Sequence, residues 1–168
     1  MAGLEGMEQP RQRAVTPPAR CGAPPAEAEA VPEEFARWGD PTAGEVRLPS
    51  RPESAGSARR LTEAVAQRLW QLSPELTEYA VLLVSELVGN AVRHTGARSV
   101  GLRMHRRRGW IRVEVRDPSR GLPCLMPVRE MDTTGRGLYL VNKLSDRWGV
   151  DLLPRGKTTW FEMRVTER

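Results

Sequence analysis

The sequence lacks the features that hold together small secreted domains and the features that anchor proteins in membranes. Its 168 residues include only two cysteines, and Cys21 and Cys124 stand in unrelated contexts without a C-x-x-C pair. This arrangement favours two free thiols over a disulfide or a zinc site. The longest apolar run, residues 79–84, is too short to cross a membrane. The N-terminus has early acids and no apolar core of a secretory signal, so we expect a cytoplasmic protein.

Histidine is as scarce as cysteine. His94 and His105 are the only two, and no acidic cluster at metal-ligand spacing accompanies them. A zinc site built by the protein alone is therefore not expected. No serine or cysteine stands in a G-x-S-x-G or comparable setting, so the sequence gives little support to a hydrolase triad.

Charge and proline are divided unevenly along the chain. Residues 1–45 hold four Arg and eight Asp or Glu, whereas residues 46–168 hold 22 basic and 13 acidic residues. Nine of the fourteen prolines occur by position 52. We expect residues 1–45, rich in Pro, Ala and Glu, to form a disordered tail before one folded domain, 46–168. A basic domain suits an anionic partner, and charge alone leaves open a nucleotide, a nucleic acid or an acidic protein surface.

Two stretches in the first half of this domain show helical periodicity. From about residue 53 to 72, apolar residues recur at spacings of three and four. The second stretch runs from Pro74 to about His94, with Ser73 as its N-cap and proline at the first helical position. Gly96 is placed to end it. These signals predict two consecutive helices with a break at residues 73 and 74.

The second helix contains a polar pair. Asn90 falls inside its apolar stripe, and Glu86 flanks the stripe one turn earlier, on the same side of the helix. An unpaired amide that faces a core costs about 1–3 kcal/mol. Asn90 must therefore be satisfied by neighbouring groups or face a ligand. Glu86 either belongs to the same site or is a flanking acid that pairs with a base such as Arg93.

The remaining elements follow a period of two, apart from one loop and one helix. Alternation predicts a hairpin over residues 98–116 with its turn at 106–109, and further strands at 46–48, 147–153 and 158–165. A loop is expected at 118–134 and a helix at about 137–144. The order strand, helix, helix, hairpin, loop, helix, hairpin implies an α+β fold. We expect a two-layer α/β sandwich with helices on one face of a mixed, largely antiparallel sheet.

Four islands of polar residues and glycines fall at the ends of these elements. They are Glu86 with Asn90, Asp117 to Gly121, Gly135-Arg136-Gly137-Leu138, and Gly156-Lys157-Thr158. Paired glycines at a helix start allow close backbone approach, and the N–H groups there attract anions such as phosphate. Glycines in that place also serve turn geometry alone. The spacing excludes both the dinucleotide fingerprint and the P-loop.

Taken in this order, the four islands resemble the GHKL superfamily of ATP-binding proteins. The closest resemblance is to its small anti-sigma-factor serine kinases and related stand-alone ATP-binding regulators, and it covers about residues 46–168. It implies the Bergerat-type form of the sandwich, with ATP and Mg²⁺ as cofactors. The pair Glu86-x-x-x-Asn90 matches the N box of the superfamily. By this resemblance Asn90 coordinates magnesium at the phosphates and Glu86 acts as general base.

The resemblance also assigns the base and phosphate contacts. Asp117 matches the carboxylate that accepts the adenine amino group, since an ionised carboxylate only accepts hydrogen bonds. The family pattern D-x-G-x-G is Asp117-x-Ser119-x-Gly121 here. Thr158 matches the threonine that supports adenine recognition beside Asp117, with Thr159 as an alternative register. The second glycine box, which wraps the phosphates, is matched by Gly135, Arg136, Gly137 and Leu138.

The function implied is that of a protein kinase that phosphorylates a Ser or Thr of an antagonist protein. The resemblance also implies a sigma factor as partner, control of transcription by partner switching, and a homodimer as in the related kinases. Neither the phosphorylatable helical hairpin of sensor histidine kinases nor a transducer domain is visible in the sequence. An alternative is a nucleotide-gated binding module without phosphate transfer. A nucleic-acid binder centred on Arg106–Arg108 is less favoured, because charges at a hairpin tip are normally solvated.

Overall fold

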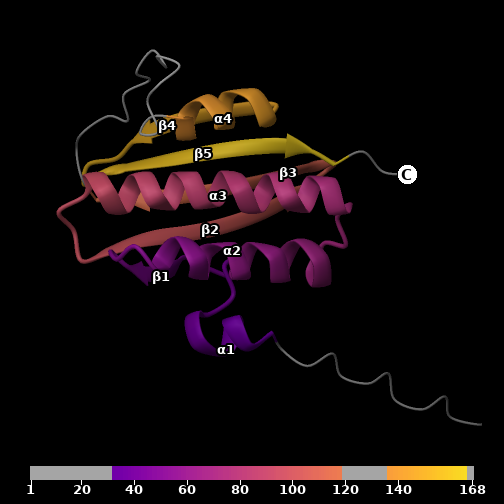
Figure 1. Ribbon diagram of the computed structural model, residues 1–168, viewed down its shortest axis with the longest axis horizontal. Helices are drawn as coiled ribbons and strands as arrows, with labels where there is room; N and C mark the ends of the chain where they lie inside the picture. The colour runs from indigo at the N-terminus through magenta and orange to yellow at the C-terminus, as the bar shows by residue number, and fades with distance from the viewer. Residues whose placement is uncertain (1–31, 119–135, 166–168) are drawn as a thin grey trace, which may run out of the picture. The chain divides into compact units, whose positions relative to one another are not determined.

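The computed structural model describes residues 32–118 and 136–165 (Figure 1). Five strands form one sheet in the order β1-β2-β3-β5-β4, and every neighbouring pair is antiparallel. The strands are β1 (Val46–Pro49), β2 (Ser99–Arg107), β3 (Trp110–Asp117), β4 (Arg147–Leu152) and β5 (Lys157–Arg164). The α+β architecture expected from the element order is confirmed. The parallel pairing of a mixed sheet does not occur among the described strands.

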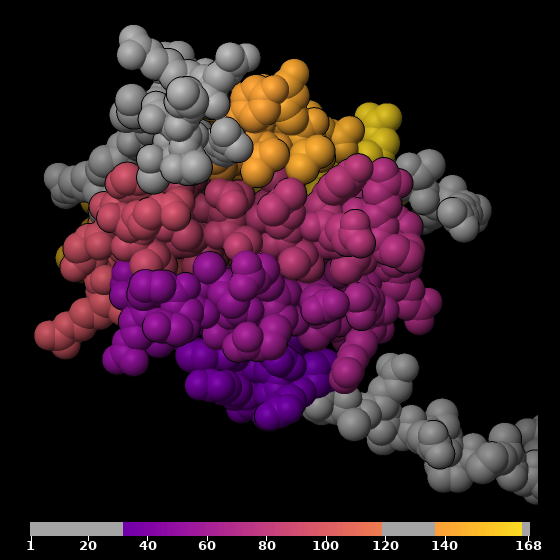
Figure 2. Space-filling model, in the orientation of Figure 1, coloured from indigo at the N-terminus to yellow at the C-terminus, as the bar shows by residue number. Residues whose placement is uncertain are grey.

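Three helices cover one face of this sheet (Figure 1). They are α2 (Ser54–Ala64), α3 (Pro74–His94) and α4 (Arg136–Leu144). The helix α3 packs between α2 and α4 and over β2 and β3, and α4 contacts β4. In the space-filling view, side chains of α2 and α3 form a continuous layer, with α4 beside α3 (Figure 2). The layer covers the apolar face of the sheet.

The core lies between the two layers because alternate strand residues point toward the helices. Val113 of β3 and Phe161 of β5 are cross-strand partners, and both are fully buried. Leu83 and Leu87 of α3 are buried in the same cluster. Burying one such side chain contributes about 1.5–3 kcal/mol. The intervening strand residues, such as Arg112, face the other side of the sheet.

A local signal sets the start of α3, whereas α2 ends before the predicted position. The Ser73 hydroxyl accepts a hydrogen bond from the Leu76 N–H at 3.2 Å, and Pro74 is the first helical residue, as predicted. The helix α2 ends earlier than expected and continues as a π-helical segment, η1 (Val65–Leu69). The Trp70 N–H donates to the Val65 carbonyl at 2.9 Å, which closes this wider turn. Helical periodicity alone does not reveal this change in winding.

The predicted tail of residues 1–45 is too long at its C-terminal end, because residues 32–45 pack on the domain. They include α1 (Glu33–Trp38), which contacts α2 and β1. Phe35 and Trp38 pack against the core. The Met104 N–H donates to the Pro41 carbonyl at 2.9 Å. The composition of this segment, rich in Pro, Ala and Glu, did not indicate these contacts, since Phe35 and Trp38 are its aromatic residues. The rest of the tail lies outside the described residues.

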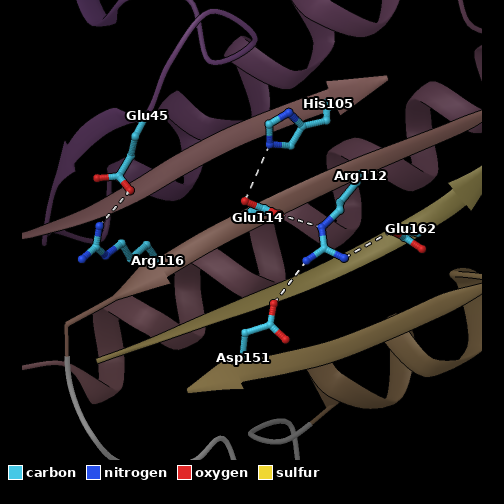
Figure 3. Close-up of polar contacts among 7 residues, drawn as sticks. All are labelled: Glu45, His105, Arg112, Glu114, Arg116, Asp151 and Glu162. Carbon is cyan, nitrogen blue, oxygen red and sulfur yellow. Dashed lines mark hydrogen bonds and ion pairs between the residues drawn. The ribbon is translucent and has the colours of Figure 1, made fainter. Parts of the chain in front are cut away.

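The face of the sheet opposite the helices carries a partly exposed network of charged side chains (Figure 3). Arg112 lies at its centre and pairs with Glu114 at 2.6 Å, Glu162 at 3.2 Å and Asp151 at 3.3 Å. Its guanidinium also stacks 4.0 Å from the centroid of the Trp160 ring. We call this set the Arg112 network. Separately, no helix among the described residues is both long and apolar enough to span a bilayer.

Candidate functional site

The first turn of α4 meets α3 at Glu86 and Asn90. A Cβ added to Gly137 would lie 2.6 Å from Glu86 Oε2 and 3.1 Å from Asn90 Nδ2. Real Cβ atoms almost never approach other atoms within 3.0 Å, so a side chain at position 137 would push Glu86 away. Glycine therefore lets the α4 backbone rest against both polar groups. Two of the four islands, far apart in sequence, meet at this contact.

The start of α4 adds the electrostatics of a helix N-terminus to this contact. The first N–H groups of a helix have no partner within the helix, and the helix dipole is positive at that end. Together these properties favour a bound anion, phosphate above all. Arg136 is the first residue of α4, and Leu138 points into the core with 6% of its surface exposed. Leu138 therefore anchors the turn by packing.

Asn90 is partly buried and already has a partner. Its Oδ1 accepts a hydrogen bond from Arg93 Nη2 at 2.8 Å. In the part of the chain that the structure describes, Arg93 thus bonds to Asn90 and makes no ion pair with Glu86. The amide oxygen of Asn90 is a hard ligand of the kind that Mg²⁺ prefers. This oxygen has a second lone pair, but a metal ion bound there would be repelled by the guanidinium of Arg93 beside it.

The second island, at the end of β3, lies next to the fourth, at the start of β5. Asp117 is buried, and its Oδ2 lies 3.0 Å from Nζ of Lys157, its cross-strand partner. Gly156 precedes this lysine with a φ of +95°, a conformation that suits glycine. A Cβ there would collide with the Asp117 carbonyl oxygen and lie 2.5 Å from Cα of Pro118. The turn before β5 therefore needs glycine to reach Asp117.

The contact of Gly137 with Glu86 and Asn90 and the pair of Asp117 with Lys157 both lie on the helix-covered side of the sheet. Since β3 and β5 are antiparallel, the end of β3 and the start of β5 lie at the same end of the sheet. The C-terminal part of α3 and the start of β2 lie at this same end (Figure 1).

Residues 48–163 match the histidine kinase-like ATPase domain. The chain belongs to this family. Membership of the GHKL superfamily, expected from the four islands, is thereby confirmed.

Two solved structures are similar to this histidine kinase-like ATPase domain. The histidine kinase domain of a blue-light-activated histidine kinase from Erythrobacter litoralis is 22% identical, with a TM-score of 0.44, and the match covers 70% of this chain and 62% of that one. A second structure of the blue-light-activated kinase is 19% identical, with a TM-score of 0.46 and coverages of 68% and 48%. The chain therefore spans less than two thirds of either neighbour. Comparison with curated proteins found no match.

Strand register decides which threonine of this ATPase domain lies beside Asp117. Thr159 is the cross-strand partner of Val115 and is buried, so it shares the inner face with Asp117. Thr158 is the partner of Arg116 and lies on the outer face, because successive strand residues alternate. Thr158, the residue predicted from the resemblance, therefore lies on the face away from Asp117. Thr159, the alternative register, is the threonine on the same face as Asp117.

Two residues that contact the predicted site residues, Lys157 and Arg93, were not among those predicted from the sequence, and two predicted ones lie outside the described residues. Lys157 received no role, although it precedes the buried residues Thr159 and Phe161 at a spacing of two. That spacing was the signal that its side chain points inward. Arg93 was considered only as a partner for Glu86. The predicted site residues outside the described part of the chain are Gly121 and Gly135.

Proposed function

We propose that the domain binds ATP with Mg²⁺ and transfers a phosphoryl group to a Ser or Thr of a partner protein. The observation that supports this most is the contact of Gly137 with Glu86 and Asn90. It brings a carboxylate and an amide against a helix N-terminus that suits phosphate. Proteins of this family bind ATP, typically with Mg²⁺. The residues present fit that pair of ligands.

Each residue at this contact has a distinct part in the proposal. Bound Mg–ATP would supply the phosphoryl group. The amide oxygen of Asn90 would hold the metal ion, and the first N–H groups of α4 would hold phosphate oxygens. Glu86 would accept the proton of the attacking hydroxyl at its carboxylate. Phosphoryl transfer needs mainly positioning and charge neutralisation, which a rigid junction of two helices provides.

Asp117 would recognise the base. An ionised carboxylate accepts hydrogen bonds and cannot donate them, so it selects an exocyclic amino group such as that of adenine. The partners in this proposal come from the resemblance to anti-sigma-factor kinases. They are a sigma factor and an antagonist protein whose Ser or Thr receives the phosphate. A second copy of the chain would complete a homodimer.

Replacement of Glu86 tests the proposed chemistry. Glu86→Gln keeps the size and a polar contact to Gly137 but removes the base. We expect the phosphorylation rate to fall by about 10²–10⁴-fold, while ATP affinity changes little. The measurements are label transfer from ATP to the antagonist protein and calorimetric titration with ATP and Mg²⁺. Glu78→Gln, an exposed acid two turns earlier on α3, is the matched control. Equal losses of rate and affinity in Glu86→Gln would contradict the assigned role.

A second candidate function is a nucleotide-gated binding module without phosphate transfer. The bond from Arg93 to Asn90 favours it, since that bond puts a cation beside the oxygen that a metal ion would need. Such a module would bind ATP and change its affinity for a partner. It would move no label to that partner. The same transfer experiment therefore separates the two candidates.

A further inference from the structure

Lys157 and Asp117 form an unusual ion pair. Their side chains are 6% and 3% exposed. Among the described residues, this is the only ion pair in which both partners are so deeply buried. In each of the others at least one side chain is more than a fifth exposed.

Such a pair is a poor choice for stability alone. Transfer of two charges from water into the interior is costly, and their attraction offsets that cost only with good geometry. A well-packed apolar pair often stabilises a core at least as well. The backbone around the pair is also constrained, because the turn before β5 reaches Asp117 only through glycine at position 156. The buried ion pair and the glycine turn together indicate that the carboxylate of Asp117 is held in a fixed position.

We propose that Lys157 is a positioning residue for Asp117 and that the pair makes the base site selective for adenine. The inference rests on the proposed nucleotide-binding function. Lys157 lies beside Asp117 in the cross-strand register, so its ammonium group holds the carboxylate from within the sheet. It fixes the carboxylate in one orientation and keeps it ionised. The ionised form accepts a hydrogen bond from the amino group of adenine.

The chemistry of a buried carboxyl group explains the selectivity. Burial without a neighbouring cation disfavours the charged form of an Asp. A protonated carboxyl group can donate a hydrogen bond, and the carbonyl oxygen of guanine accepts one. Loss of Lys157 would therefore weaken the preference for adenine as well as overall affinity. Arg116, the next residue on β3, cannot replace it, because Arg116 lies on the outer face and pairs with Glu45.

Nucleotide titrations of charge variants test the proposal. ATP and GTP are each titrated with Mg²⁺ into the wild-type chain, Lys157→Met, Lys157→Arg and the control Arg112→Met. Arg112 is a cation of the same sheet on the opposite face. We expect Lys157→Met to bind ATP about ten- to a hundredfold more weakly, with the ratio of ATP to GTP affinity reduced at least about tenfold. Lys157→Arg should recover most of that ratio, and Arg112→Met should keep it.

Three results would overturn the inference. The first is a folded Lys157→Met with wild-type affinity and ratio. The second is tighter ATP binding by that variant, which would mean that Lys157 blocks Asp117. The third is equal weakening of both nucleotides without recovery in Lys157→Arg, as expected of a purely structural pair. Lys157→Gln, which keeps an N–H donor without charge, gives the same comparison if Lys157→Met does not fold. A wild-type chain that binds neither nucleotide would instead refute the proposed function itself.

Discussion

The two faces of one sheet handle charge in opposite ways. On the outer face, Arg112 pairs with three carboxylates (Figure 3), and its guanidinium also stacks on the Trp160 ring. These charged side chains remain partly open to solvent. On the helix-covered face, Asp117 pairs with Lys157, and both side chains are deeply buried. The Arg112 network thus joins several partly exposed charges, whereas the inner pair holds two charges in the interior. Removal of one charge should therefore have very different consequences on the two faces.

Solvent explains the contrast. Partial burial would lower the pKa of Arg112, but hydrogen bonds to Glu114 and Glu162 outweigh this and raise the pKa above its ordinary value. The cation thus keeps its charge and can exchange partners. Exposed ion pairs typically contribute about 0.2–1 kcal/mol each. Removing one partner of a buried pair costs about 3–5 kcal/mol, because it leaves a buried charge uncompensated.

The largest expected effect follows from Asp117→Ala. The substitution leaves the ammonium group of Lys157 in the interior without this carboxylate, so the free energy of unfolding should fall by about 3–5 kcal/mol. Chemical denaturation monitored by circular dichroism measures it. Glu114→Ala, on the outer face of the same strand, is the control and should lose less than about 1 kcal/mol. Equal losses in the two variants would remove the distinction between the faces.

A smaller effect is expected from Gly137→Ala at the junction of α3 and α4. The added methyl group would displace Glu86 or the first turn of α4. A misplacement of about 1 Å can reduce activity on the order of a hundredfold, and we expect ATP affinity to fall about tenfold. Calorimetric titration measures the affinity. Gly96→Ala is the matched control, since nothing lies within 4 Å of a Cβ there. Unchanged affinity in Gly137→Ala would argue against phosphate at this junction.

The smallest effect concerns salt. Exposed charges are screened at high ionic strength, where the Debye length falls to about 3 Å at 1 M. The stability difference between the wild-type chain and Arg112→Met should therefore shrink in 1 M sodium chloride. The difference between the wild-type chain and Lys157→Met should stay nearly constant, because both side chains of that pair are almost fully buried and buried pairs are screened much less. Thermal unfolding at low and high salt gives both differences, and parallel behaviour would contradict this account.

The sequence predicted the elements better than their detailed contacts. The bounds of α3 and the hairpin of β2 and β3 follow from periodicity, a cap and a turn, which are local signals. The packing of α1 depends on Phe35 and Trp38 reaching a distant core, and nothing local encodes that contact. The choice between Thr158 and Thr159 was left open because a shift of one residue along a strand reverses the face. Pairing of Lys157 with Asp117 depends on the same register.

The convergence of the four islands was proposed from their order, and the structure brings them together in two pairs. Gly137 against Glu86 and Asn90 could be anticipated only as a hypothesis, since no local pattern gives the distance between α3 and α4. The role of Arg93 was missed for a related reason. Its side chain can reach either Glu86 or Asn90, which lie on adjoining turns of one helix. Only the geometry decides between them.

The most direct test of the account is calorimetric titration of the wild-type chain with ATP in the presence and absence of Mg²⁺. We predict one binding site per chain, tighter binding with Mg²⁺ than without it, and loss of that Mg²⁺ dependence in Asn90→Ala. If the wild-type chain binds ATP with the same affinity with and without Mg²⁺, or does not bind ATP at all, the claim that Asn90, Glu86 and the start of α4 form a nucleotide site is contradicted.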